Sequence, residues 1–342
     1  MTGKERFNAI VEGISDTCGF WHGDPNPASM EKLYAYFKVA NDFELGLKLG
    51  SICRWVRPEE CHAWTKNEPI FDVLGGRQRS TLAEGGVFSE TEDPAEVDDF
   101  PWPDAAYMDY AETIKEMDKT VAAGQAVLSG AWCCFFHDVC NFVGMENYFM
   151  KMYTHPEVVD TITRRVVDFY LAANEELFRQ AGNKIDAFFF GNDFGSQLDL
   201  LISPELFDRF IMPYFRELIN QARRHGLRVA LHSCGSIDRV IPTLIDAGVD
   251  ILHPIQAMAK NMDAESLNRK YKGKIVFMGG VDTQRLLPFG APDDVRAEVR
   301  RLKNLFGPNY IVSSSHESIL PNVAPENISA MAETAAEIQA LI

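Results

Sequence analysis

The chain alternates short apolar runs with amphipathic segments, and this alternation restricts its fold more than any other feature. The runs are rich in Val, Ile, Phe and Leu, as buried parallel strands are. They span residues 126–134, 185–193, 227–235, 249–256, 274–282 and 310–316, and an earlier run at 45–56 can supply a further strand. Repeated strand–helix units predict a parallel sheet with right-handed crossovers.

The segments between these runs carry helix start and stop signals. In the segment 203–226, Ser203 is the expected N-cap, Pro204 suits the first helical position, and Gly226 ends the helix. The amphipathic segment after residue 236 closes at Gly248. Helices are therefore expected where the alternation requires them.

A closed barrel and an open doubly wound sheet both fit this alternation. No GxGxxG pattern opens a helix, which weakens the dinucleotide-binding form of the open sheet. Several runs also end in polar residues, as barrel strands do around an active site. These residues are Asp193, His232, Cys234, Gln256, Asp282 and His316. We expect one α/β domain over residues 1–342, a (β/α)8 TIM barrel with residues 1–44 as helical decoration over its N-terminal region.

The net charge excludes some classes of partner. At −16, the chain repels nucleic-acid phosphates and anionic membrane surfaces. The N-terminal segment has no apolar signal-peptide region, and no run is long enough to span a membrane. Seven irregularly spaced cysteines are typical of reduced thiols. We expect a cytoplasmic monomer or homodimer with no nucleic-acid or membrane partner.

His232 and Cys234 form the strongest chemical signal in the chain. Residues i and i+2 of an extended segment point to the same side, so imidazole and thiolate converge. This nitrogen and sulfur pair suits Zn²⁺, and a catalytic zinc needs a third protein ligand beside an open position. His316 is the best candidate, with its neighbour Glu317 as the alternative. A buried cysteine beside a histidine with no metal remains the simpler interpretation.

Polar residues near other strand ends are candidates for the same site. Asp193 either orients a ligand histidine, holds substrate, or caps the turn after its strand. Asn192 and Gln197 are adjacent candidates for substrate binding. His137, which follows the 126–134 run with Asp138, is either a substrate-contacting acid or base or a buried, hydrogen-bonded histidine.

The run at 274–282 ends in a third group of candidates. Gly279 and Gly280 would let a bulky ligand approach the backbone, with Asp282 beside it and Gln256 at the preceding strand end. Tryptophans at 21, 55, 102 and 132 could line such a cavity. Cys133 and Cys134 point to opposite faces if both lie in a strand, so they cannot easily bind the same metal ion, and we interpret them as core residues.

Four segments in order resemble the uroporphyrinogen decarboxylase superfamily. They are FFFGNDFGSQLDLLISPELFDRFIMPYF, LHSCGSIDRVIPTLIDAGVDILHPIQ, FMGGVDTQRLLPFG and HESILPNVAPENISAM, within residues 100–335. The resemblance implies a (β/α)8 barrel with one of two chemistries. One is cofactor-free decarboxylation of uroporphyrinogen, and the other is zinc-dependent methyl transfer linked to a corrinoid.

The residues of this chain favour the methyltransferase branch. True decarboxylases carry an Arg-rich N-terminal segment, RQAGR, for the carboxylates of a tetrapyrrole. The corresponding segment here, GFWHGDPNPASMEKL, has no arginine; it offers Trp21 for substrate binding, His22 for catalysis, and Asp24. The methyltransferase branch has the histidine and cysteine found at His232 and Cys234, but its late third cysteine is missing here, where His316 and Glu317 stand.

The resemblance therefore implies a zinc-dependent methyltransferase. It would move a methyl group between a small methylated compound or thiol and a corrinoid supplied by a partner protein. If His316 is the third ligand, zinc keeps a charge of +1, which favours releasing an oxygen leaving group in a demethylation. Two alternatives stay open: a cofactor-free decarboxylase of porphyrin biosynthesis, and a non-catalytic ligand-binding barrel.

Overall fold

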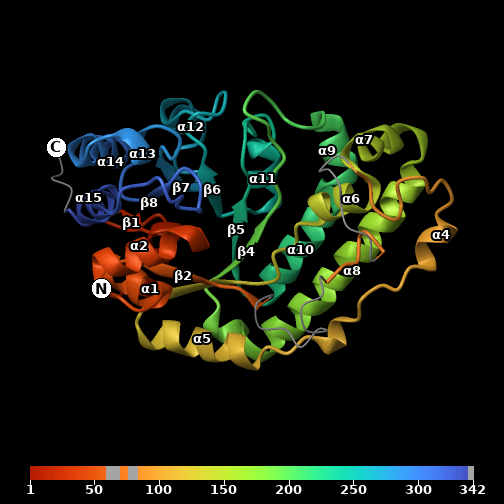
Figure 1. The fold of residues 1–342 in the computed structure, drawn as a ribbon, viewed down its shortest axis with the longest axis horizontal. Coiled ribbons are helices and arrows are strands. Elements are labelled where there is room, and N and C mark those ends of the chain that lie inside the picture. The colour runs from red at the N-terminus through yellow and green to blue at the C-terminus, as the bar shows by residue number, and fades with distance from the viewer. Residues whose placement is uncertain (59–69, 76–83, 338–342) are drawn as a thin grey trace.

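The computed structural model describes residues 1–58, 70–75 and 84–337 and contains a parallel sheet rolled around its own core (Figure 1). Within these residues the sheet has eight strands, each beside its neighbour in sequence, in the order β1-β8-β7-β6-β5-β4-β3-β2. The strands are β1 (Gly19–Phe20), β2 (Cys53–Val56), β3 (Ala126–Ser129), β4 (Ala187–Gly191), β5 (Arg228–His232), β6 (Ile251–Ile255), β7 (Val276–Val281) and β8 (Tyr310–Ser314).

The two ends of this strand order meet, which makes the sheet a barrel. On one side β1 pairs in parallel with β8, Gly19 opposite Ile311. On the other side the Ile52 N–H, just before β2, donates to the Phe20 carbonyl of β1 at 2.9 Å. The predicted (β/α)8 barrel is confirmed, and the open sheet is excluded.

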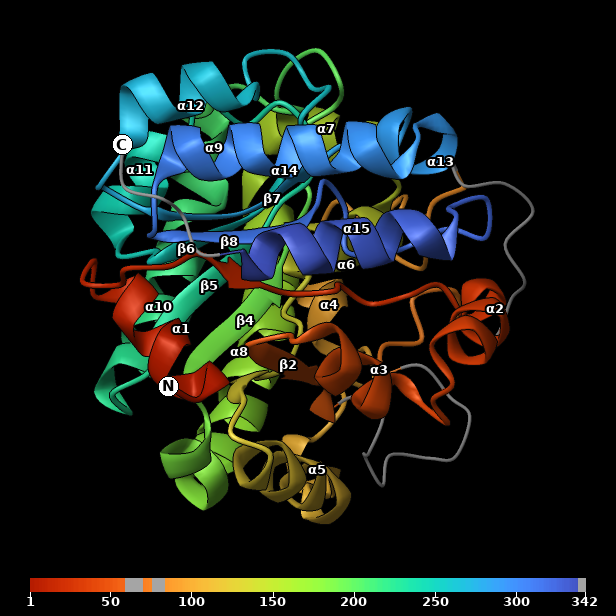
Figure 2. The same ribbon diagram turned by 90° about the vertical axis from the view of Figure 1, so that its left-hand side faces the viewer.

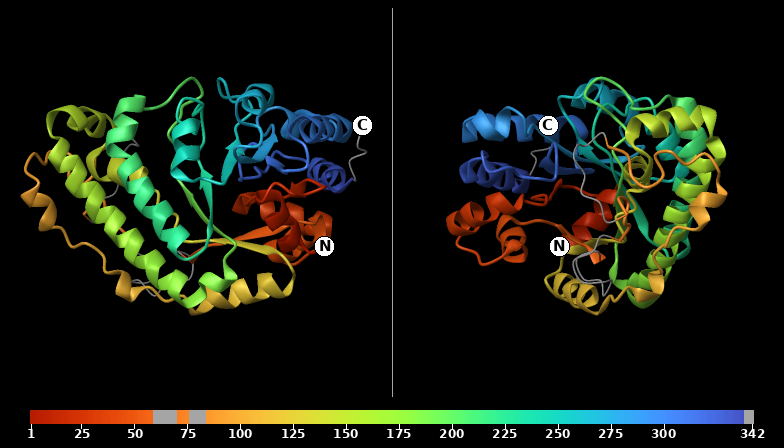
Figure 3. Two further views of the ribbon diagram at one scale, coloured as in Figure 1. Left: turned by 180° about the vertical axis from the view of Figure 1, so that it is seen from behind. Right: turned by 45° about the vertical axis from the view of Figure 1, so that its right-hand side comes forward.

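Helices surround the barrel on its outside (Figures 2 and 3). They are α1 (Gly3–Val11), α2 (Pro27–Phe37), α3 (Asp42–Leu49), α4 (Ala95–Asp98), α5 (Ala111–Ala122), α6 (Phe135–Val143), α7 (Met145–Thr154), α8 (Pro156–Ala181), α9 (Pro204–Phe210), α10 (Met212–Arg224), α11 (Ile241–Ala247), α12 (Ala264–Tyr271), α13 (Leu286–Phe289), α14 (Pro292–Phe306) and α15 (Pro325–Ala336), with short 3₁₀ turns at Ala105–Tyr107 and Gly182–Lys184. Among those described, no helix is long and apolar enough to cross a membrane.

Each strand divides its side chains between two cores. In β4, Ala187 and Phe189 face the barrel interior, whereas Phe188 and Phe190 join the layer beneath the helices. This alternation follows from the period of two along a strand. A barrel interior filled in this way is a packed core, and access to it is left to the strand ends.

The N-terminal region corrects one prediction. Residues 1–44 are not only helical decoration, because Gly19–Phe20 forms the first barrel strand. A strand of two residues has no periodicity to detect, so it was missed. Helix α1 does lie at the N-terminal end of the barrel, where Phe7 and Ile10 join the interior core.

Two other boundaries differ from the predicted ones. The run at 126–134 forms a strand only to Ser129; Cys133 has φ 50°, and helix α6 begins at Phe135, so His137 lies on a helix. The segment 203–226 forms two helices that break at Ile211, before Pro213. Its predicted start is confirmed, because the Ser203 hydroxyl accepts a hydrogen bond from the Leu206 N–H.

Candidate metal centre

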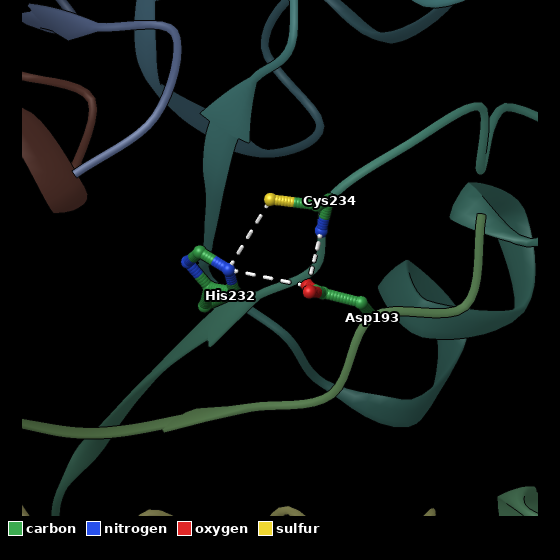
Figure 4. A group of neighbouring side chains, drawn as sticks. All are labelled: Asp193, His232 and Cys234. Carbon is green, nitrogen blue, oxygen red and sulfur yellow. Dashed lines mark hydrogen bonds and ion pairs between the residues drawn. The ribbon is translucent and has the colours of Figure 1, made fainter. Parts of the chain in front are cut away.

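His232, the last residue of β5, occupies the centre of a polar cluster at the C-terminal mouth of the barrel (Figure 4). Its Nε2 lies 3.4 Å from Cys234 Sγ and 3.2 Å from Asp193 Oδ1. The His232 side chain is buried, at 4% exposure. The expected convergence of the i and i+2 side chains is therefore present, with a carboxylate that follows the neighbouring strand β4.

Local backbone contacts hold Asp193 and Cys234 together. The Cys234 N–H donates to Asp193 Oδ1 at 2.8 Å, which ties the segment after β5 to the segment after β4. Gly235, at φ +89°, lies so close to Gly195 that a Cβ on it would come within 2.1 Å of the Gly195 carbonyl oxygen. Glycine at this position lets the two segments pack directly together.

The cluster fits a tetrahedral metal ion. Asp193, His232 and Cys234 each offer one donor atom, and these atoms all lie within 4.8 Å of one another. Donors bound to zinc at about 2.0–2.3 Å in a tetrahedron lie roughly 3.3–3.6 Å apart. The two separations measured from Nε2, 3.2 and 3.4 Å, are close to that range. Nitrogen, sulfur and carboxylate oxygen are all accepted zinc ligands.

The other nitrogen of His232 faces a second group of side chains. Its Nδ1 lies 3.0 Å from Nδ1 of His253, on β6, and 3.4 Å from Glu317 Oε2. Burial lowers the pKa of His253 well below its usual value, and the neighbouring His232 lowers it further. A neutral His253 can accept the Nδ1 proton of His232, which leaves Nε2 of His232 free to bind a metal ion.

His316 follows β8 and lies next to the cluster. Its ring centroid is 6.1 Å from that of His232. The Ser318 N–H donates to His316 Nδ1 at 3.0 Å, and Glu317 Oε2 lies 3.4 Å from the same nitrogen. Contact with the Cys234 side chain raises the pKa of His316. His316 belongs to neither group of described side chains that are close enough to share an ion, since those groups are Asp193–His232–Cys234 and His232–His253–Glu317.

The electrostatics of the cluster favour charged forms despite its burial. Burial opposes ionisation of Asp193, yet His232 and the Cys234 N–H hold the pKa of its carboxyl well below the usual range. Burial likewise opposes protonation of His232, but Glu317, Asp193 and Cys234 together raise its pKa well above the ordinary value. An excess of negative groups around one imidazole is the environment that attracts a cation.

A small cavity opens beside these groups. Its volume is about 160 Å³, and it is lined by Trp132, His137, Gly191, Asn192, Asp193, His232, His316 and Glu317. The Trp132 ring lies against Gly191, where a Cβ would come within 2.2 Å of it, and its centroid is 5.3 Å from that of His232.

A larger hollow of about 430 Å³ lies at the other end of the barrel, around α1 and the segments that enter β6, β7 and β8. It holds none of the cluster residues, so the small cavity is the candidate site.

The structure does not bring His22 into the cluster. Its Nδ1 lies 2.8 Å from the Ser51 hydroxyl, and its Nε2 lies 2.9 Å from Asp42 of α3. These bonds tie β1 to the segment that enters β2, which is a structural role. Trp21 is buried beneath the site, with its ring centroid 5.2 Å from that of His253.

Of the other residues predicted to bind substrate, some lie at or beside the cavity and one does not. Asn192 lines the cavity, but its side chain is engaged by the Phe136 N–H and the Cys133 carbonyl. Gln256 accepts a hydrogen bond from the Gly235 N–H, beside the cluster. Gln197 is exposed and is not among the residues that line the described cavity.

Asp282 follows a different strand, β7, and its hydrogen bonds stabilise a turn. Its carboxylate accepts hydrogen bonds from the N–H groups of Gln284, Arg285 and Leu286, so it caps the turn that enters α13. His137 reaches the cavity from α6, and burial lowers its pKa. Both interpretations of His137 that the sequence left open are compatible with this position.

His253 is the main residue that sequence analysis missed. The available signal was a histidine inside the apolar run ILHPI, at an inward-facing position of β6. Among the cysteines outside the cluster, Cys18, Cys53 and Cys140 are free, as is Cys234 within it. Cys61 lies outside the described residues.

Comparisons with known proteins agree with this architecture. A search of curated proteins finds no significant match. Among solved structures, a methyltransferase from Methanosarcina mazei aligns with a TM-score of 0.63 and 16% sequence identity, over 98% of each chain. At this identity, the likeness establishes a shared fold. The family model of uroporphyrinogen decarboxylase (URO-D) matches residues 80–338. Because this match covers most of the sequence, the chain belongs to the uroporphyrinogen decarboxylase (URO-D) family.

Proposed function

We propose that this protein is a zinc-dependent methyltransferase. It moves a methyl group between a small methylated compound or a thiol and a corrinoid carried by a partner protein. The observation that carries the proposal is the cluster of Asp193, His232 and Cys234 at the barrel mouth, whose donor atoms have the spacing of zinc ligands. The fold shared with the methyltransferase from Methanosarcina mazei supports it.

The residues around the cavity prepare the site. Zinc bound by these donors would act as a Lewis acid for the oxygen or sulfur that gains or loses the methyl group. His253 accepts the His232 Nδ1 proton and so directs Nε2 toward the cavity. The hydrogen bond between Asp193 and the Cys234 N–H keeps carboxylate and thiol on the same side of His232. Trp132 lines one wall of the cavity.

Decarboxylation of a tetrapyrrole finds less support in the same cavity. Uroporphyrinogen carries eight carboxylates, and each must exchange its hydration for a charge-assisted partner. None of the residues that line the described cavity is an arginine or a lysine. Arg57, which follows β2, is paired with Asp24 at 3.0 Å and lies over the Trp55 ring. Family membership alone does not determine the reaction, so the reaction must be inferred from the residues of the site.

Elemental analysis of the purified protein tests the proposal. We expect about one zinc per chain in the wild type, because three donors are already in position. Cys234→Ala should lose most of this zinc, while Cys18→Ala, which removes a buried thiol just before β1, should keep it. A wild-type protein that neither contains zinc nor takes it up on addition would overturn the proposal.

A further inference from the structure

His316 has a hydrogen bond that decides which of its nitrogens carries the proton. A backbone N–H can only donate, so the Ser318 N–H at 3.0 Å makes Nδ1 of His316 an acceptor. In a neutral imidazole the proton then resides on Nε2. A nitrogen that carries a proton has no lone pair for a metal ion, so this arrangement prevents Nε2 from acting as a ligand.

The neighbouring groups agree with a proton on Nε2. Glu317 Oε2 is farther from Nδ1 than the Ser318 nitrogen, at 3.4 Å, and makes no hydrogen bond there. Because Nδ1 is occupied by the Ser318 N–H, Nε2 is the nitrogen of His316 that remains available to a bound group. The His316 ring lines the cavity together with Asp193 and His232, and its centroid is 6.1 Å from that of His232, so Nε2 has access to a group that binds there.

We infer that His316 is a hydrogen-bond donor to the substrate atom that holds negative charge, and that Asp193, not His316, is the third metal ligand. This inference rests on the proposed function. An ion bound by one carboxylate, one thiolate and one neutral imidazole keeps no net charge, so it stabilises a departing oxygen or a thiolate less than a positively charged site would. A donor fixed beside the open position supplies the missing stabilisation.

The assignment predicts that substitutions of His316 and of Asp193 change the zinc affinity of the protein by different amounts. This difference can be measured without any methyl transfer. Competition with a chelator gives the affinity, and the absorption of the Co²⁺-substituted protein reports the ligand set. His316→Ala should bind zinc within about threefold of the wild type and leave the Co²⁺ spectrum unchanged. Asp193→Ala should lower the affinity at least about tenfold and shift the spectrum. His155→Ala, which removes a histidine at the start of α8, is the matched control and should change neither.

Methyl transfer provides the second measurement. His316→Ala should lower kcat by roughly 10²–10³-fold with zinc bound, the cost of losing one fixed donor. His316→Gln should recover part of this loss, because its amide N–H can donate near the Nε2 position; a purely structural histidine would show no such rescue.

The outcomes separate the two proposals. Loss of zinc affinity in His316→Ala, with affinity retained in Asp193→Ala, would overturn the inference and leave the proposed function intact. Full methyl transfer by zinc-loaded His316→Ala would also overturn it. A wild-type protein that binds no zinc would remove the proposed function and this inference together.

Discussion

At the scale of single residues, Asp138 is a half-buried acid that lies outside the metal cluster. Burial raises the pKa of its carboxyl to about 7, although hydrogen bonds from Tyr170 and Cys134 oppose this effect. The Tyr170 hydroxyl donates to Asp138 Oδ2 at 2.7 Å. The folded protein therefore holds a proton on Asp138 that the unfolded chain releases near pH 4.

This difference predicts how stability changes with pH. A carboxyl with a raised pKa in the folded state contributes its full stability at low pH and loses it as pH rises through about 7. Asp138→Asn cannot ionise and still accepts from Tyr170. Its free energy of unfolding relative to the wild type should increase by on the order of 2 kcal/mol between about pH 5 and pH 8, after allowance for partial exposure.

Urea unfolding at both pH values measures this change. Asp16→Asn, a substitution at an exposed carboxylate, is the control and should alter the pH dependence little. Equal pH dependence in Asp138→Asn and the wild type would show that Asp138 ionises normally in the folded protein.

The residue types of the site were more predictable than their arrangement. His232 and Cys234 could be placed together because a strand's period of two determines which side chains share a face. Asp193 was found for another reason: it is a polar residue at the end of the preceding strand, and the ends of parallel barrel strands collect at one mouth. The contact between His232 and His253 depends on the register of β5 and β6, where these residues lie opposite each other. No local pattern encodes that register, so His253 was not singled out.

At the scale of elements, helix α1 closes the end of the barrel opposite the candidate site. Phe7 and Ile10 are fully buried and pack with the interior residues of the barrel strands. Its start is a capping box, in which the Thr2 hydroxyl accepts from the Glu5 N–H and Glu5 accepts from the Thr2 N–H. The helix therefore stabilises the barrel without touching the metal cluster.

Removal of the Phe7 ring should separate stability from zinc binding. Phe7→Ala leaves a cavity in the barrel core and should cost about 3–5 kcal/mol of unfolding free energy. Ile14→Ala, at a side chain that is 73% exposed, should cost less than about 0.5 kcal/mol. Zinc affinity measured on folded Phe7→Ala should match the wild type, and a tenfold loss would show that the two ends of the barrel are coupled.

Elements with a strong local pattern were predicted, and those without one were missed. The strands β4 to β8 each carry an apolar run of about the right length, and Ser203 and Gly248 mark helix ends that the structure contains. The strand β1 has two residues, and its place comes from pairing with β8, the last strand of the chain. The run at 126–134 was predicted as one strand because its residues are apolar, but β3 ends at Ser129 and helix α6 begins at Phe135.

At the scale of the whole molecule, charge and fold together bound the chemistry. The family supplies a barrel whose mouth collects side chains from several strands. The net charge of −16 repels polyanions from the molecule as a whole, and the described cavity at the mouth is lined by Asp193 and Glu317 with no arginine or lysine. The same charge suits a site that binds a cation. The cluster around His232 would attract a cation in the same way, because two carboxylates and a thiol lie beside one imidazole.

This charge distribution predicts no useful decarboxylation of uroporphyrinogen. The described cavity offers no cationic partner for eight carboxylates, and Asp193 and Glu317 would repel them. Incubation with uroporphyrinogen under anaerobic conditions, followed by chromatography of the porphyrins, should yield no coproporphyrinogen above the enzyme-free control. Turnover at a rate typical of enzymes would place this chain with the decarboxylases of its family instead.

The proposed function requires zinc held by His232 and Cys234 to support methyl transfer to or from a corrinoid. The most direct measurement follows the absorbance of a reduced corrinoid incubated with the zinc-loaded protein and a panel of methyl ethers and methyl thioethers. We predict that at least one compound methylates the corrinoid with the wild type and with Cys18→Ala, and that Cys234→Ala loses this activity with its zinc. Methyl transfer that survives in zinc-free Cys234→Ala would contradict the account.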